Sequence, residues 1–214
     1  MPLKLVSFSL YGNERKYNWG AIVNALEMPK IYPGWTMRVY CADDVDANEL
    51  QRLGCQIERM GVSHDQSGML WRFLPLWEEG VERVIFRDAD SIINPKEAAA
   101  VEAWIQSGKT AHMMHDHPHH CSMPVMGGMW GCRGNMVPHM TAEWMRWMSS
   151  MKRRVADMSI LSTYIYPHIK DSVMRHSSQP LQWPYEPFPP FKDKFDGFIG
   201  QQHDNSPEWA PVWP

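Results

Sequence analysis

The sequence predicts a single α/β domain with a mostly parallel central sheet flanked by helices and an irregular C-terminal arm. Segments of apolar, β-favouring residues alternate with helical segments over the first half of the chain, which is the pattern of parallel strands joined by crossover helices. A chain of 214 residues can fold around one core. We therefore treat residues 1–214 as one domain, composed of residues 1–108, residues 109–180 and an arm over residues 181–214.

Strand and helix signals follow one another regularly up to residue 114. Apolar runs predict strands over residues 3–10, 35–41, 56–60, 81–86 and 109–114. Helical patterns predict helices over residues 14–26 and 69–79 and a helix that starts at Asp43-Asp44. Another helix is predicted over residues 98–105, with Asn94-Pro95 at its start and Gly108 at its end. Ligands of such sheets bind beyond the carboxyl ends of the strands. We therefore expect a site formed by the loops after Leu10, Cys41, Phe86 and Met114.

The second half of the chain is less regular. Residues 140–154 and 157–169 are predicted to form helices, and residues 172–175 a short strand. From Pro180 onward the chain is rich in proline, tryptophan and phenylalanine. Because flexible linkers are poor in aromatic residues, we expect this arm to pack against the body of the domain.

Composition and charge argue against several classes of protein. Charged residues make up 21% of the chain and the formal net charge is −3, so we expect no basic surface that attracts nucleic acid or anionic lipid without sequence preference. No apolar run is long enough to cross a bilayer, and residues 1–10 resemble a strand more than a signal peptide. The four cysteines, without secretory features, are typical of reduced thiols. We expect a cytoplasmic protein.

The strongest chemical signal is the segment Val84-Ile85-Phe86-Arg87-Asp88-Ala89-Asp90-Ser91, in which two aspartates follow an apolar strand. Alternate side chains of an extended segment point the same way, so Asp88 and Asp90 can reach one ion together. Mg²⁺ and Mn²⁺ prefer oxygen ligands and commonly share them with substrate phosphates. The alternative interpretation is a turn with two solvated aspartates, against which the preceding strand argues.

The strand, Asp88-Ala89-Asp90 and the helix that follows resemble the Asp-x-Asp signature of GT-A glycosyltransferases. The resemblance implies a GT-A-like fold in which residues 1–108 form the nucleotide-binding half and residues 109–180 the sugar and acceptor half. It also implies a hexosyltransferase-like enzyme that uses Mn²⁺ or Mg²⁺. Such an enzyme moves a sugar from a nucleoside diphosphate sugar, with a UDP-sugar as the first expectation, to an acceptor that the sequence does not identify.

Two later segments extend this resemblance. Asp157-Met158-Ser159-Ile160-Leu161 is similar to the Asp-Gln-x-x-Leu pattern of retaining GT-A enzymes, with Met158 in the place of glutamine. This similarity implies a catalytic role for Asp157 and slightly favours retention of configuration. His176, after the predicted short strand, is similar in position to the histidine that completes the metal shell in these families. The resemblance thus implies His176 as the third metal ligand, with His203 as the alternative.

The segment from Pro124 to Gly134 resembles the glycine-containing strand and loop that face the donor sugar in GT-A enzymes. Gly127 and Gly128 let the backbone approach a ligand closely, and Trp130 offers a ring that can stack on a sugar face. A bulged strand whose glycines relieve a packing clash is the alternative.

Further candidates for donor binding lie near the ends of the early strands. Ser7, Tyr11 and Gly12 resemble nucleotide-facing residues of GT-A folds. Asp43 or Asp44 can hydrogen-bond a ribose or base, and Arg72 is a further candidate. The planar guanidinium of Arg72 offers a fork of donors to a phosphate. A surface salt bridge is the alternative role for this arginine.

Histidines gather in the segment around residues 112–120. Taken alone they suggest a zinc or iron site, with His112, His115, Asp116, His117, His119 and His120 as candidate ligands. Adjacent residues on an extended segment point in opposite directions and do not all converge on one ion. We therefore interpret Asp116 as a catalytic residue that contacts the donor sugar or the acceptor, and His117 as a donor-binding residue.

Two alternatives stand beside glycosyl transfer. One is another metal-dependent nucleotide-processing enzyme, a nucleotidyltransferase or a phosphohydrolase, in which the aspartates and the histidine-rich segment share the metal. The other is a carbohydrate-binding module, which the 11 tryptophans favour but the acidic pair does not. The sequence has no Gly-x-x-x-x-Gly-Lys-Ser/Thr loop and no Gly-x-Gly-x-x-Gly after the first strand, which argues against P-loop and dinucleotide-binding proteins.

Overall fold

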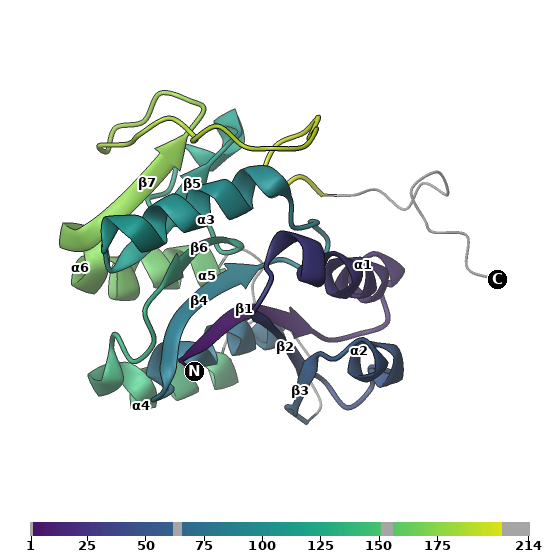
Figure 1. Cartoon of the computed structure of the whole chain (residues 1–214). Helices are drawn as coiled ribbons and strands as arrows, with labels where there is room; N and C mark the ends of the chain where they lie inside the picture. The colour runs from purple at the N-terminus through teal and green to yellow at the C-terminus, as the bar shows by residue number, and fades with distance from the viewer. Residues whose placement is uncertain (1, 62–65, 151–155, 203–214) are drawn as a thin grey trace.

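The structure is a computed structural model that describes residues 2–61, 66–150 and 156–202. Its strands are β1 (Leu3–Leu10), β2 (Thr36–Cys41), β3 (Gln56–Arg59), β4 (Val81–Arg87), β5 (Ala111–His115), β6 (Met129–Cys132) and β7 (Val173–Ser177). They form one sheet in the order β3-β2-β1-β4-β6-β5-β7 (Figure 1). β6 runs antiparallel to β4 and to β5, whereas the other neighbours are parallel. The prediction of one α/β domain with a mostly parallel sheet is confirmed.

Helices cover both faces of this sheet. They are α1 (Arg15–Ile31), α2 (Asn48–Arg52), the 3-10 helix η1 (Gln66–Trp77), α3 (Pro95–Ser107), α4 (Thr141–Ser150), α5 (Ala156–Ile160), the π-helix η4 (Leu161–Ile165) and α6 (Tyr166–Ile169). Short 3-10 turns are η2 (Pro118–His120), η3 (Pro138–Met140) and η5 (Lys170–Ser172). α1 and α3 lie on one face of the sheet in Figure 1, and η1 packs on the other face together with α4.

Local sequence signals explain where α3 begins and ends. The Asn94 side chain accepts a hydrogen bond from the backbone N–H of Glu97 at 3.1 Å, Pro95 occupies the first turn, and Gly108 ends the helix with a φ of 70°. A left-handed φ suits glycine because it has no Cβ. The predicted N-cap, first-turn proline and C-terminal glycine are thus all confirmed.

Three predicted helices differ from the structure. The helix expected to start at Asp43-Asp44 is the short α2, which begins at Asn48. The segment expected to be an α-helix over residues 69–79 is the 3-10 helix η1, which contains Pro75, and proline removes a backbone donor from the α-helical ladder. The predicted helix over residues 157–169 is divided into α5, the π-helix η4 and α6, which has Pro167 in its first turn.

The fold brings several loops to one edge of the sheet. β1 and β4 are parallel neighbours, so the chain after Leu10 and the chain after Arg87 leave the sheet side by side. Because β6 is antiparallel and Met129 pairs with Arg87, the glycine-containing segment before Met129 reaches the same edge.

Candidate active site

The edge where β1 and β4 end contains a cavity of about 530 Å³. Eight residues predicted from the sequence line it together: Tyr11, Gly12, Arg72, Asp88, Asp90, Gly127, Gly128 and Asp157. They come from five segments that are far apart in the chain.

Arg72, on η1, joins two of the acidic side chains. Its guanidinium is buried, forms an ion pair with the carboxylate of Asp88 and donates a hydrogen bond to Asp157 Oδ2 at 3.0 Å. The backbone of Arg72 is fixed to β1, because Ser7 Oγ donates to its carbonyl at 2.7 Å and its N–H donates to Ser9 Oγ at 2.8 Å. Ser7 is fully buried and holds the backbone of Arg72 through this hydrogen bond. Our expectation that Ser7 faces a nucleotide is therefore corrected.

The carboxylates of Asp88, Asp90 and Asp157 line the cavity together, and Asp88 interacts electrostatically with the other two. Burial opposes ionisation of Asp88, but the Arg72 guanidinium outweighs it and lowers the pKa of this carboxyl below its ordinary value. Burial and the charge of Asp88 raise the pKa of Asp90, although Lys16 Nζ lies 3.3 Å from Asp90 Oδ2. Burial also raises the pKa of Asp157, against the attraction of Arg72. A cation between Asp88 and Asp90 would relieve the repulsion that the structure shows.

The Asp-Ala-Asp loop is held tightly by α1. A Cβ on Gly20 would lie 2.0 Å from the carbonyl oxygen of Ala89, so the helix approaches the loop too closely for any side chain. Four residues further along the helix, the buried Asn24 donates to the carbonyl of Ser91 at 3.1 Å and accepts from the N–H of Ile93 at 2.9 Å. The backbone that carries both aspartates is therefore fixed from one side.

The buried ion pair between Arg87 and Glu97 also fixes the acidic loop. Arg87 is fully buried, and its guanidinium donates to the Gly128 carbonyl at 2.7 Å and to Ser91 Oγ at 3.2 Å and lies 3.1 Å from Glu97 Oε2. Glu97 also accepts from the hydroxyl of Tyr32 at 3.0 Å. This network ties the glycine-containing segment to the acidic loop, and we did not predict it from the sequence.

Positions 127 and 128 need glycine because the carboxylates of Asp157 and Asp88 leave no room for a Cβ atom. A Cβ on Gly127 would lie 2.4 Å from Asp157 Oδ2, and one on Gly128 would lie 2.0 Å from Asp88 Oδ2. We expected the backbone at these two glycines to approach a ligand closely. In the structure it approaches the acidic side chains of the cavity instead.

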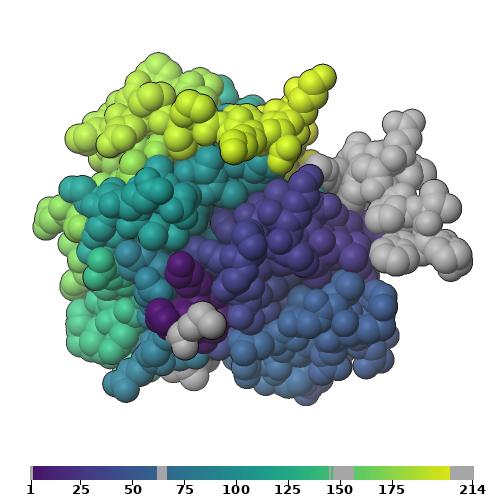
Figure 2. Space-filling model, in the orientation of Figure 1, coloured from purple at the N-terminus to yellow at the C-terminus, as the bar shows by residue number. Residues whose placement is uncertain are grey.

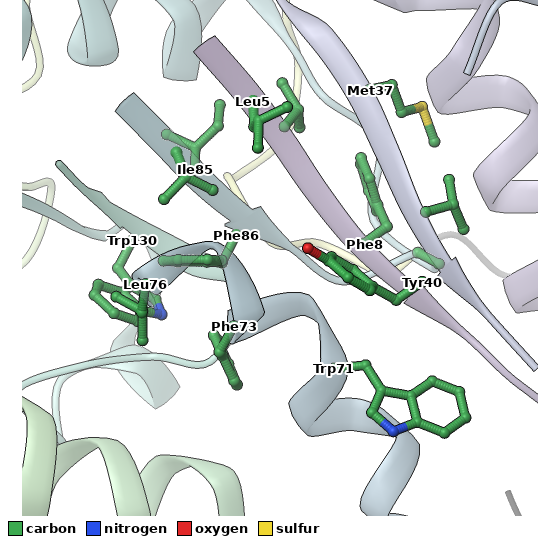
Figure 3. Close-up of a cluster of buried hydrophobic side chains, with 14 of the residues drawn as sticks. Leu5, Phe8, Met37, Tyr40, Trp71, Phe73, Leu76, Ile85, Phe86 and Trp130 are labelled. Carbon is green, nitrogen blue, oxygen red and sulfur yellow. The ribbon is translucent and has the colours of Figure 1, made fainter. Parts of the chain in front are cut away.

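Trp130 and Asp43 do not contribute to the cavity. Trp130 is fully buried in the core, with its ring centroid 4.5 Å from that of Phe86 and 5.9 Å from that of Phe73 (Figure 3). Its ring therefore has no face free for a sugar, which corrects our expectation. Asp43 and Asp44 are exposed on the loop after β2 and do not line the cavity.

The histidine-rich segment also lies away from the cavity. Asp116 pairs with Lys96 at 2.6 Å, and the ring of His117 stacks on Phe198 with centroids 4.4 Å apart. Neither residue lines the cavity. These contacts correct the expectation that Asp116 and His117 face the donor sugar or the acceptor.

His176 does not join the acidic pair. It is buried on β7, where its Nδ1 lies 2.8 Å from His112 Nε2, three strands away from β4 in the sheet. Among the residues that the structure describes, no group of three or more histidine, cysteine, aspartate or glutamate side chains could hold a metal ion. The position of His176 therefore corrects the expected ligand set, and the alternative ligand, His203, lies outside the described residues.

Several residues of the site were not predicted. They include Ser9, Tyr17, Met69, Met126, Met129, Met158 and Gln202, which line the cavity, and Lys16, which pairs with Asp90. Methionines and a glutamine scattered over distant segments carry no spacing signal, because tertiary structure alone brings them together. Lys16 could have been noted as a cation in the first turn of the helix after the first strand.

The fold is similar to that of solved GT-A nucleotide-diphospho-sugar transferases. One similar structure is a glycosyltransferase involved in the glycosylation of the major capsid of PBCV-1, with 14% identity, a TM-score of 0.52 and coverage of 82% of each chain. Another is glucosyl-3-phosphoglycerate synthase from Mycobacterium tuberculosis in complex with Mn²⁺, UDP and glucosyl-3-phosphoglycerate. That match has 11% identity, a TM-score of 0.52 and coverage of 82% of this chain and 70% of that chain.

At these identities the likeness establishes the fold. No protein-family model and no curated protein sequence matches the chain. Within the described part of the chain, no helix combines the length and the apolar character needed to span a membrane.

Proposed function

We propose that the protein is a metal-dependent glycosyltransferase that moves a sugar from a nucleoside diphosphate sugar to an acceptor, with retention of configuration. The observation that carries this proposal is the convergence of the acidic pair Asp88 and Asp90, together with Asp157, on one cavity of a GT-A fold. The Mycobacterium tuberculosis enzyme of this fold was crystallised with Mn²⁺ and UDP, which supports a UDP-sugar as donor.

The donor set of the cavity fits a hard divalent cation. Asp88 and Asp90 present carboxylate oxygens, which Mg²⁺ and Mn²⁺ prefer, and burial together with the charge of Asp88 raises the pKa of Asp90. Mg²⁺ is commonly held by one or two carboxylates and completes its shell with water and substrate phosphates, so the two aspartates and a diphosphate supply most of the oxygen ligands of such a site. When bound, the cation supplies Lewis-acid stabilisation to the departing diphosphate.

Arg72 and Asp157 have separate roles in the proposed transfer. Arg72 holds the carboxylates of Asp88 and Asp157 in one arrangement through its ion pairs. The bond between the anomeric carbon and the diphosphate breaks with its electron pair on the diphosphate. An acceptor oxygen then bonds to the same face of the carbon, and the acceptor's proton passes to the diphosphate. Asp157 stabilises the positive charge that develops on the anomeric carbon, an effect that is large in a site shielded from water.

The proposal is tested by calorimetric titration of UDP in the presence of Mn²⁺ and again after chelation of the metal. We expect binding with metal, at least roughly tenfold weaker binding without it, and slow metal-dependent hydrolysis of UDP-glucose or UDP-galactose. Asp88→Asn removes a ligand charge at nearly constant shape and should abolish both. Asp43→Asn, at an exposed position outside the cavity, is the matched control and should change neither.

The same assays separate glycosyl transfer from its alternatives. A phosphohydrolase would release inorganic phosphate from UDP itself, and a nucleotidyltransferase would release pyrophosphate from a nucleoside triphosphate. UDP binding that does not depend on a divalent metal, or that is equal in wild type and Asp88→Asn, would overturn the proposal.

A further inference from the structure

The described part of the C-terminal arm, residues 181–202, contains no helix or strand and crosses the surface over α3 (Figures 1 and 2). Isolated bridges join it to the body, one between His176 and Glu186 and one between Ser91 and Gln202. The second bridge is informative, because Ser91 directly follows Asp90 and Gln202 lines the cavity. The end of the arm therefore lies at the mouth of the candidate site.

A buried charged pair holds the arm in this position. Lys96 Nζ lies 2.6 and 2.7 Å from the two carboxylate oxygens of Asp116, and Asp116 Oδ2 also accepts a hydrogen bond from the backbone N–H of Ile199 at 2.9 Å. Asp116 is only 5% exposed. A carboxylate in such a place is stable only while it stays paired and hydrogen-bonded, so the Ile199 amide is part of what satisfies it.

Apolar and aromatic contacts strengthen this attachment. Ile199 is fully buried in a small cluster that includes Ala100, Met114 and Met129. Beside it, Phe198 stacks on the ring of His117. His117 and His120, of the histidine-rich segment, thus contact Phe198 of the arm.

Only two residues, Gly200 and Gln201, separate the attachment point at Ile199 from Gln202 in the cavity. Gly200, next to Ile199, adopts a left-handed φ of 84°, and a Cβ there would lie 2.4 Å from Met129 Sδ. Met129 itself lines the cavity. The short connection from Ile199 through Gly200 to Gln202 leaves little freedom to place Gln202 elsewhere while Ile199 remains bound to Asp116.

We propose that Asp116 is a positioning residue that fixes the C-terminal arm, so that Gln202 forms part of the donor-binding site. This inference rests on the proposed function for the identity of the ligand, a nucleoside diphosphate. The amide of Gln202 can donate a hydrogen bond to a phosphate or ribose oxygen and accept one from a hydroxyl. Asp116 acts at a distance: it fixes Ile199, and the short connection places Gln202.

The first test measures the arm in the protein without ligand. Hydrogen–deuterium exchange of Asp116→Ala should show the Ile199 amide exchanging at least roughly tenfold faster than in wild type, because its acceptor is gone. Asp196→Ala, an exposed position on the same arm, is the matched control and should leave exchange at Ile199 unchanged. If Asp116→Ala fails to fold, Asp116→Ala/Lys96→Met replaces it, since the double variant leaves no unpaired buried charge.

The second test measures UDP affinity in the presence of Mn²⁺. Asp116→Ala and Gln202→Ala should each weaken UDP binding by roughly tenfold, and Gln202→Ala should do so without changing exchange at Ile199. The variant Asp116→Ala/Gln202→Ala should bind UDP no more weakly than either single variant, because both changes remove the same contact. A role of Asp116 in stability alone would not produce this non-additivity.

Two results would overturn the inference. One is wild-type exchange at Ile199 in Asp116→Ala. The other is faster exchange with UDP affinity within about twofold of wild type, which would show that the attached arm does not contribute to the site. If wild-type protein does not bind UDP at all, the proposed function and the ligand role of Gln202 both fail, and exchange at Ile199 still decides whether Asp116 holds the arm.

Discussion

Gly128→Ala adds one methyl group next to the acidic pair and changes none of the proposed ligand residues. The new Cβ would lie 2.0 Å from Asp88 Oδ2 and 2.9 Å from the Asp88 backbone nitrogen. Ordinary contact needs about 3.5 Å, so the carboxylate must retreat by more than about 1 Å. That retreat disturbs its ion pair with Arg72. Because φ of Gly128 is not left-handed, the effect comes from the contact and not from backbone strain.

Two quantities should change in Gly128→Ala. Overpacking should lower the free energy of unfolding by about 1–3 kcal/mol, measured by urea titration. Metal-dependent UDP affinity or turnover should fall by about 100-fold, the scale of a 1 Å misplacement in a catalytic site. Gly134→Ala is the matched control, since its Cβ would lie 2.5 Å from the Val81 carbonyl oxygen at the opposite end of β4. It should lose stability and keep UDP affinity, and if Gly128→Ala keeps both affinity and turnover within about threefold, the reasoning is refuted.

Three further predictions concern single residues. Asp157→Asn should lower turnover by about 100-fold with little change in UDP affinity, and turnover within about threefold of wild type would reduce Asp157 to a partner of Arg72. His203→Ala should raise the Mn²⁺ concentration needed for UDP binding by at least about tenfold; if the requirement shifts in His176→Ala instead, the structural placement of His176 is contradicted. Burial lowers the pKa of His115 to about 4, so the unfolded state takes up a proton first and stability is lost as pH falls from about 6.5 to about 4. The contribution of His115 to this loss amounts to about 2 kcal/mol at pH 5. Burial also lowers the pKa of His112, His120 and His176, so His115→Gln should reduce the difference in stability between urea titrations at pH 7.5 and 5 by about 2 kcal/mol. A difference equal to that of wild type would contradict the assignment to His115.

Most of the fold could be predicted because its signals are local. The apolar run from Leu3 to Leu10 and the Asn94-Pro95 cap with Gly108 each specify one element through neighbouring residues. The antiparallel β6 could not be predicted in this way, since the direction of a strand depends on the path of the long connection before it. Pro75 was visible in the sequence and should have weakened the expectation of an α-helix over residues 69–79.

The candidate site was predictable where chemistry and local structure coincide. Asp88 and Asp90 directly follow a strand, so their place at the sheet edge follows from the strand itself. Trp130 was misplaced because a residue type suited to a role says nothing about whether its side chain points into the core. His176 was misplaced because local sequence does not set the strand order, which puts β7 three strands from β4. The buried pair of Arg87 and Glu97 joins a strand to a helix ten residues later, and no rule of spacing identifies such a contact beforehand.

The charge arrangement in the cavity determines how metal and nucleotide binding depend on each other. Each member of the acidic pair already has a protein cation: Arg72 at Asp88 and Lys16 at Asp90. A divalent cation therefore gains less binding free energy from these two carboxylates than it would from two carboxylates without protein partners. The described residues provide no third ligand beside them. Mn²⁺ alone should bind weakly, and a diphosphate that supplies further oxygens should increase its affinity. Linkage requires Mn²⁺ to increase the affinity for UDP by the same factor, so the two ligands should enter the site as a unit.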